Sequence, residues 1–279
     1  MIKGNIVHNN SLANFFEKYF IHKGCENYWE LLWELARTDF KLRYHGSFLG
    51  YVWALVKPLS MFLILNFVFS TLFNRLNTGT QYYSLQLIIS IILFNFFAEG
   101  TMAGLTSLFN KSALITKIFV PRWIIVVAST VQSTLIFLMN LIVIVIFCFW
   151  YRCWPGIHGI IVFFFYILLT YLLIMSIAFI TAPLYVKYRD LQHIWEVVST
   201  ALFYASPIVY PLSILPARYH RIILANPIAF LVQYSKTALT EHSWASFEQN
   251  AIFVAAILTL FLVSLRVFKR LEATVADNL

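Results

Sequence analysis

The stretch 121-PRWIIVVASTVQSTLIFLMNLIVIVIFCFW-150 decides the fold class, because it holds no charged side chain after Arg122. A helix rises about 1.5 Å per residue, so roughly 20 residues cross a hydrocarbon layer of about 30 Å. This stretch is longer, which predicts a transmembrane helix that is tilted or extends beyond the bilayer.

Similar apolar stretches flank it on both sides, at 48–73, 83–104, 157–186, 193–215 and 251–268. No acidic residue occurs between Asp39 and Glu99, or between Glu99 and Asp190. A carboxylate at the centre of a bilayer costs about 2.5–3.5 kcal/mol, so these gaps are where the spans must lie. The sequence therefore predicts six transmembrane helices.

The composition excludes a soluble domain. Hydrophobic residues make up 61% of the chain and charged residues 11%, with a mean hydropathy of +0.77, whereas soluble domains hold about 25% charged residues. The apolar runs are continuous, unlike the alternating segments of a membrane β-barrel. We expect an all-α integral membrane protein whose transmembrane domain covers 48–279.

The net charge of +8 has a topological explanation. With six spans and a cytoplasmic N-terminus, 14 of the 20 Lys and Arg residues lie inside, five lie outside and Lys57 falls within a span. Basic residues concentrate on the cytoplasmic side of membrane proteins. We therefore expect both termini in the cytoplasm and no nucleic-acid partner.

The N-terminal segment 1–47 carries an amphipathic pattern between residues 26 and 45. Four charged residues are spaced by four, three and four positions, which places them on one face of a helix: Glu30, Glu34, Arg37 and Lys41. A neighbouring stripe is apolar and holds Trp29, Trp33, Ala36 and Phe40. The pattern favours a helix lying in the membrane surface, and a solvated helix packed on another subunit is the open alternative.

The segment 212–250 is too interrupted to span a bilayer. Pro207, Pro211 and Pro216 precede or enter it, and each removes a backbone donor. The short apolar pieces 222–225 and 228–239 flank Asn226-Pro227. A pair of re-entrant helices at the outer surface and a plain external loop both fit.

The chain lacks the motifs of an enzyme or a motor. It has no G-x-x-x-x-G-K-[ST] phosphate loop, no H-E-x-x-H and no Cys/His ligand cluster, so we expect no catalytic residue, metal or cofactor in this chain. Glu99 and Glu196 border predicted spans, where a capping role is commoner than a proton relay. Free thiols are favoured for Cys25, Cys148 and Cys153, with a disulfide between the last two left open.

The stretch 107–122 has the composition of a docking segment. It is cationic, free of acids and interleaved with Leu108, Leu114, Ile115 and Ile118. A short helix here could present these side chains to a soluble subunit. The alternative is an ordinary positive loop that fixes topology.

Several landmarks follow one another along the chain. Residues 39–53 read D-x-K-x-R-Y-x-x-S-x-L-G-x-x-W, with Pro58 after them, and residues 110–121 read N-x-x-x-L-I-x-K-x-x-x-P. Later come 188-YRDL-191, 206-SPI-208 with Tyr210, 226-NP-227 and the tail 268-FKRLE-272 with Ala276-Asp277. Their order resembles the ABC-2 type permeases, and the tail is similar to members that export cell-surface polysaccharides. Val120 stands where a phenylalanine is often found.

The resemblance implies a homodimer in the bacterial inner membrane, with two separate ATPase subunits that hold ATP and Mg. It implies export of a lipid-linked polysaccharide such as O-antigen, capsule or teichoic acid. It makes the 26–45 helix an interface helix and 107–117 a coupling helix. The residues expected to contact the ATPase are Asn110, Lys111, Leu114, Ile115, Lys117, Arg189 and Asp190.

Aromatic side chains suit a route for a sugar polymer, because ring faces stack against sugar C–H faces. The candidates are Trp53, Phe94, Phe97, Tyr204 and Tyr210; lipid-facing packing is the alternative for each. Two other functions stay open: efflux of drugs or lipids within the same family, and a transferase acting on lipid-linked sugars. The transferase would need acids such as Asp39, Asp190 and Glu196 to gather.

Overall fold

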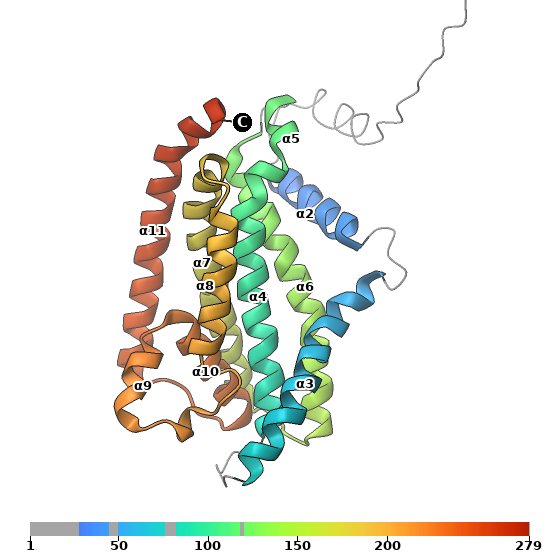
Figure 1. The fold of residues 1–279 in the computed structure, drawn as a ribbon, viewed down its shortest axis with the longest axis vertical. Coiled ribbons are helices and arrows are strands. Elements are labelled where there is room, and N and C mark those ends of the chain that lie inside the picture. The colour runs from blue at the N-terminus through green and yellow to red at the C-terminus, as the bar shows by residue number, and fades with distance from the viewer. Residues whose placement is uncertain (1–27, 45–49, 76–81, 118–119, 279) are drawn as a thin grey trace, which may run out of the picture.

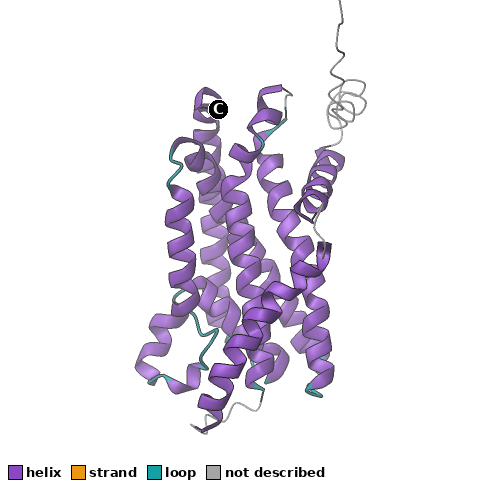
Figure 2. Cartoon of the chain, turned by 45° about the vertical axis from the view of Figure 1, so that its right-hand side comes forward, coloured by secondary structure: helices purple, strands orange, loops and turns teal. Residues whose placement is uncertain are grey.

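The computed structural model describes residues 28–44, 50–75, 82–117 and 120–278. Within these ranges every regular element is helical (Figure 2). The long helices are α3 (Trp53–Arg75), α4 (Tyr83–Asn110), α6 (Arg122–Trp150), α7 (Ile157–Lys187) and α11 (Phe247–Asn278). The shorter ones are α2 (Tyr28–Tyr44), η1 (Gly50–Val52), α5 (Ser112–Lys117), α8 (Leu191–Ala205), η2 (Leu212–Ile214), α9 (Ala217–Leu224) and α10 (Pro227–Thr240). The all-α membrane class is confirmed.

Helix α4 is the central helix of the bundle (Figure 1). It contacts α3, α6, α7, α8 and α10. It meets α7 closely at two glycines: a Cβ on Gly104 would lie 2.4 Å from the Cβ of Ala178, and one on Gly100 would lie 3.0 Å from Ile174. The G-x-x-x-G spacing of these glycines thus marks a close helix contact.

Five of the described helices are long and apolar enough to cross a membrane: Gly50–Phe69, Tyr83–Asn110, Arg122–Trp150, Ile157–Lys187 and Phe247–Glu272. The expectation of one continuous span over 193–215 was wrong. Helix α8 ends at Ala205, and a non-helical segment at 206–211 follows. Pro207 and Pro211 explain the end, because a proline cannot donate to a helical carbonyl and disfavours helical backbone before it.

Helix α8 and the segment after it nevertheless run along most of α4. Trp195 near the start of α8 donates to Thr101, Phe203 packs on Phe94, and the carbonyl of Val209 accepts from Tyr83. The contacts therefore follow α4 from Thr101 back to its first residue, a length of about 27 Å at 1.5 Å per residue. Helix α8 and the 206–211 segment thus lie together along α4 over a length close to that of a transmembrane helix.

The bend between α9 and α10 fits either the expected re-entrant pair or a broken span, and we call the two helices the re-entrant pair. They are bent by 111° at the break between them. Lys236 of α10 reaches back to Pro207, and Thr240 at its end accepts from Gln86 in the first turn of α4. The last part of α10 therefore lies at the end of the bundle where α4 begins, and α9 lies at the same end (Figure 1). We call this the α9 end; the opposite end, which carries α5, is the α5 end (Figure 1).

Helix α2 is amphipathic, as its sequence indicates. Its buried face holds Leu31, Leu32, Leu35 and Ala36, which join an apolar cluster with α6, α7 and α11. Trp29 and Trp33 are exposed. On the polar face Glu34 lies 3.9 Å from Arg37 across one turn, and Lys41 is exposed. The helix thus packs against its own chain through its leucine-rich face.

Candidate functional site

A docking platform: the end of α4, helix α5 and the α7–α8 turn

The predicted coupling segment folds into the last turn of α4 and the short helix α5. Leu114 and Ile115 turn inward and pack against the cluster beneath α2. Asn110 and Lys117 are exposed. The interleaving of apolar and cationic residues therefore gives α5 one face that anchors it and one face open to a partner. Residues 118 and 119 of the predicted segment lie outside the described residues.

Lys111 joins the platform to α2. Its Nζ lies 2.5 Å from a carboxylate oxygen of Asp39, and both side chains are largely buried. The backbone carbonyl of Asp39 also accepts from Gln132 of α6, at 3.2 Å. A movement of α5 would therefore be transmitted to α2 through one ion pair.

The turn between α7 and α8 lies beside the same platform. The guanidinium of Arg189 sits 4.7 Å from the centre of the Phe109 ring, in the last turn of α4. Tyr185 packs edge-on against Phe109 and donates to Gln192. Asp190 is exposed at the start of α8. The structure thus brings Arg189 and Asp190 to the same end of the bundle as Asn110.

The aromatic candidates separate into two groups. Phe94 and Phe97 are buried inside the chain, where α8 covers them through Phe203 and Trp195. Trp53 and Tyr204 are 49% and 68% exposed, and Tyr210 is half-buried. The exposed group faces away from the core, so a route outside this chain would meet it first. A role in lining a route stays a prediction for all five.

No role was predicted for Tyr83 or Lys236, yet both bind the 206–211 segment through hydrogen bonds. Tyr83 donates to the Val209 carbonyl at 2.7 Å, and the ammonium of Lys236 donates to the Pro207 carbonyl. Asn226 donates to Ser206 at 3.5 Å and caps α10 by accepting from the N–H of Ile228. The S-P-I and N-P landmarks were the available signal, because prolines leave carbonyls that need outside donors.

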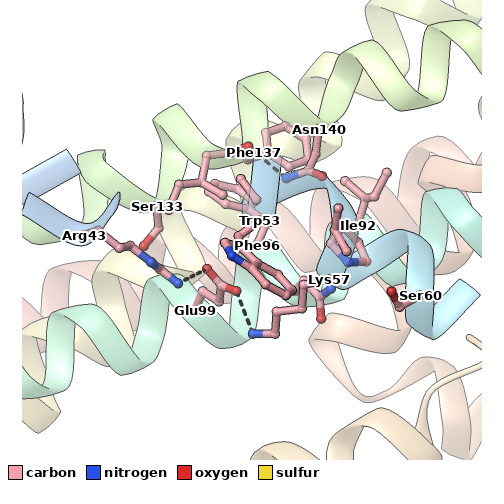
Figure 3. A pocket seen from close by; sticks show the side chains of 15 residues that line it. Arg43, Trp53, Lys57, Ser60, Ile92, Phe96, Glu99, Ser133, Phe137 and Asn140 are labelled. Atoms are coloured by element: carbon pink, nitrogen blue, oxygen red, sulfur yellow. Dashed lines mark hydrogen bonds and ion pairs between the residues drawn. The ribbon is translucent and has the colours of Figure 1, made fainter. Parts of the chain in front are cut away.

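Glu99 bridges two cations near the start of α3 (Figure 3). One carboxylate oxygen lies 2.8 Å from Arg43 and the other 3.0 Å from Lys57. This triad links α2, α3 and α4, which favours a structural role for Glu99 over a proton relay. Glu196 is exposed on α8 and accepts from Gln192 at 3.3 Å.

A metal or acid centre finds no support in the described part of the chain. Within it, no three His, Cys, Asp or Glu side chains gather to hold a metal ion. Asp39 is committed to Lys111. Cys148 and Cys153 are buried free thiols, and Cys25 lies outside the described ranges.

The comparison with known proteins fits this architecture. The model of the ABC-2 type transporter family matches residues 30–237. The chain belongs to this family. It is 27% identical to the O-antigen export system permease protein RfbA of Klebsiella pneumoniae, over 90% of this chain and 95% of that protein. It is 23% identical to the protein of the same name from Myxococcus xanthus, over 89% and 95% of the two chains.

The match to the ABC-2 type transporters spans α2 to most of α10. It therefore includes the platform, the Lys111–Asp39 pair, the Arg43–Glu99–Lys57 triad and the re-entrant pair. Helix α11 follows it and packs mainly on α7. Its later part meets α6, where Arg122 donates to the Glu272 carbonyl.

Proposed function

We propose that this chain is the permease subunit of an ABC exporter that moves a lipid-linked, O-antigen-like polysaccharide across the bacterial inner membrane. Two relatives that match nearly full length carry the name of O-antigen export permeases. The sequence has no phosphate loop, so ATP and Mg belong to a separate ATPase subunit. The α5 end then faces the cytoplasm, where basic residues concentrate.

The observation that carries the proposal is the platform at the α5 end. Lys117 and Asn110 are exposed, Arg189 is held beside them by Phe109, and α5 is tied to α2 through Lys111. A soluble partner seated here gains cationic and polar contacts on a surface that is connected mechanically to two helices. In this proposal the energy for transport comes from a soluble partner that binds the platform.

A homodimer supplies the route for the polymer. Helix α3 and helix α8 flank α4 and expose large apolar side chains, among them Leu63, Phe67, Val197 and Tyr204. A two-fold pairing of such faces buries them and leaves a path between chains. Trp53 and Tyr204 lie on the helices that would border that path, and Phe94 and Phe97 would support its wall from within.

Deletion and complementation test the proposal. Deleting the gene should abolish surface polysaccharide, while lipid-linked polymer that has not been exported accumulates on the cytoplasmic side of the membrane. The wild-type gene should restore export, and Lys117→Glu should lower it several-fold without lowering the amount of folded permease. Arg218→Glu is the matched control, since Arg218 is exposed at the other end of the molecule. Normal surface polysaccharide in the deletion strain would refute the function.

A further inference from the structure

A cavity of about 560 Å³ lies between α3, α4 and α6, and the Arg43–Glu99–Lys57 triad forms part of its wall (Figure 3). Pockets that hold small ligands measure about 300–1,000 Å³. The three helices contribute different chemistry: α3 supplies Trp53 and Lys57, α4 supplies Phe96 and Glu99, and α6 supplies polar side chains. The cavity is therefore large enough and mixed enough to hold a ligand.

The α6 wall contains two buried polar atoms that lack partners. Asn140 is 6% exposed and Ser133 is 2% exposed, and neither Oδ1 of Asn140 nor Oγ of Ser133 makes a hydrogen bond. The amide nitrogen of Asn140 donates to the Ile136 carbonyl of its own helix at 2.9 Å, which leaves its oxygen without a partner in the wall of the cavity. Buried polar atoms are nearly always satisfied by protein, water or ligand.

The kind of hydrogen-bond partner that these atoms lack restricts the chemical class of the ligand. An amide oxygen only accepts hydrogen bonds, so Asn140 needs a donor. Acyl chains and phosphodiester groups carry no donor, whereas a hydroxyl group both donates and accepts and so satisfies Asn140 and Ser133 alike. The deep part of the cavity therefore favours a hydroxyl-bearing ligand over a lipid tail or a lipid phosphate.

The mouth of the cavity also has groups that can meet a hydroxyl. Glu99 lies 3.0 Å from Lys57 and 2.8 Å from Arg43, so the triad combines one carboxylate with two cations. A hydroxyl can accept from the ammonium or donate to the carboxylate without breaking the bridge. Trp53 and the stacked pair Phe96 and Phe137, 4.5 Å between ring centres, add the apolar surface that suits sugar C–H faces.

We propose that this cavity binds one hydroxyl-rich sugar unit of the exported polymer. The inference rests on the proposed function, because it names the part of the substrate that the permease contacts. Each permease chain would hold the polymer at α6 and α4 of its own bundle, with Asn140 and Ser133 as binding residues.

Binding to the full-length permease in lipid nanodiscs tests the site. The probe is a set of oligosaccharides of one to three sugar units, released by mild acid from the strain's own surface polymer. Saturation-transfer NMR titration measures their affinity for the wild type, Asn140→Leu and Ser133→Ala. The matched control is Gln233→Leu, because Gln233 also has a side-chain oxygen without a partner but lies on α10, outside the cavity.

The site predicts saturable binding to the wild type, at least tenfold weaker binding to Asn140→Leu, weaker binding to Ser133→Ala and no change in Gln233→Leu. Thermal unfolding of each variant shows whether it is folded. If Asn140→Leu does not fold, the smaller change Ser133→Ala still tests the site. The inference would be overturned by an absence of saturation transfer, or by an affinity in both cavity variants equal to that of the wild type. Displacement of the sugar by inorganic phosphate would overturn it as well.

Surface polysaccharide in the complemented deletion strain separates the two proposals. If the wild-type permease restores export and the oligosaccharides do not bind, the sugar site is wrong and the exporter stands. If the wild type restores no export, the exporter itself is wrong.

Discussion

The two ends of this molecule are held together by different chemistry. At the α5 end, charged side chains make the connections: Lys111 with Asp39, and Glu99 with Arg43 and Lys57. At the α9 end, Tyr83 and Lys236 donate to backbone carbonyls of the 206–211 segment. The Glu99 pairs are partly exposed, where ion pairs are weak and sensitive to salt, while the Lys111–Asp39 pair is largely buried. Buried donors to backbone carbonyls are costly to lose.

The difference indicates a division of labour. An end that receives a partner's movement benefits from contacts that can break and re-form at small cost. An end that must keep a broken span and a re-entrant pair in place benefits from contacts that do not. We therefore expect substitutions at the α9 end to lower stability, and those at the α5 end to lower coupling.

The largest loss of stability is expected for Lys236→Ala. The change removes the donor to Pro207 and leaves a cavity at a 3% exposed position, which should lower the free energy of unfolding by about 2–5 kcal/mol. Ser235→Ala is the control, since Ser235 is buried next to it with no hydrogen-bond partner for its hydroxyl. Denaturant unfolding in detergent measures both; equal stability of the two variants would contradict the anchoring role.

A somewhat smaller loss is expected for Gly159→Ala. A Cβ there would lie 2.5 Å from the carbonyl oxygen of Ala238, so α7 and α10 must separate, at a cost of about 1–3 kcal/mol. In Gly156→Ala the nearest atoms, in the His242 ring, are 3.9 Å away, and stability should not change. A thermal shift of the same size in both proteins would show that α7 and α10 are not closely packed.

Charge reversal at Lys111, which pairs with Asp39 of α2, should lower coupling. Lys111→Glu places two carboxylates together at a largely buried site, so it should lower ATP-dependent export several-fold and also lower stability. The double variant Asp39→Lys, Lys111→Glu restores the pair with opposite polarity and should recover part of the export. Failure of any recovery would mean that Lys111 contacts the ATPase directly and does not act through α2.

The smallest effect concerns the thiol of Cys153, in the turn between α6 and α7. Burial raises its pKa above the ordinary value, and its Sγ lies 3.6 Å from the Leu239 carbonyl oxygen. Near pH 8 a smaller fraction of this thiol than of an ordinary thiol is therefore ionised, so it reacts more slowly with a maleimide. Fast labelling of the folded permease at that pH would show that the turn opens.

Long apolar runs and their positions were predictable because the bilayer fixes a length and excludes charge. The amphipathic spacing of α2 was equally clear from Glu30 to Lys41. The end of α8 was missed because 193–215 is mostly apolar, and hydropathy does not register that Pro207 and Pro211 end a helix. The prolines were visible, but they were weighed only for the segment after 212.

The site was less predictable, since its contacts join residues far apart in the sequence. Lys111 and Asp39 are 72 positions apart, and Lys236 and Pro207 are 29 apart. Motif order brought Arg189 and Asn110 into one hypothesis, but only the fold shows that Phe109 links them. No pattern marked Asn140 and Ser133, because an unpartnered polar atom is a property of packing.

The most direct test of a permease driven in trans uses inside-out vesicles that contain the lipid-linked polymer. We predict that vesicles with this chain alone neither hydrolyse ATP nor translocate polymer, and that adding the cognate ATPase subunit starts both. Translocation by the permease alone, or translocation with the ATPase that does not depend on ATP, would contradict the account.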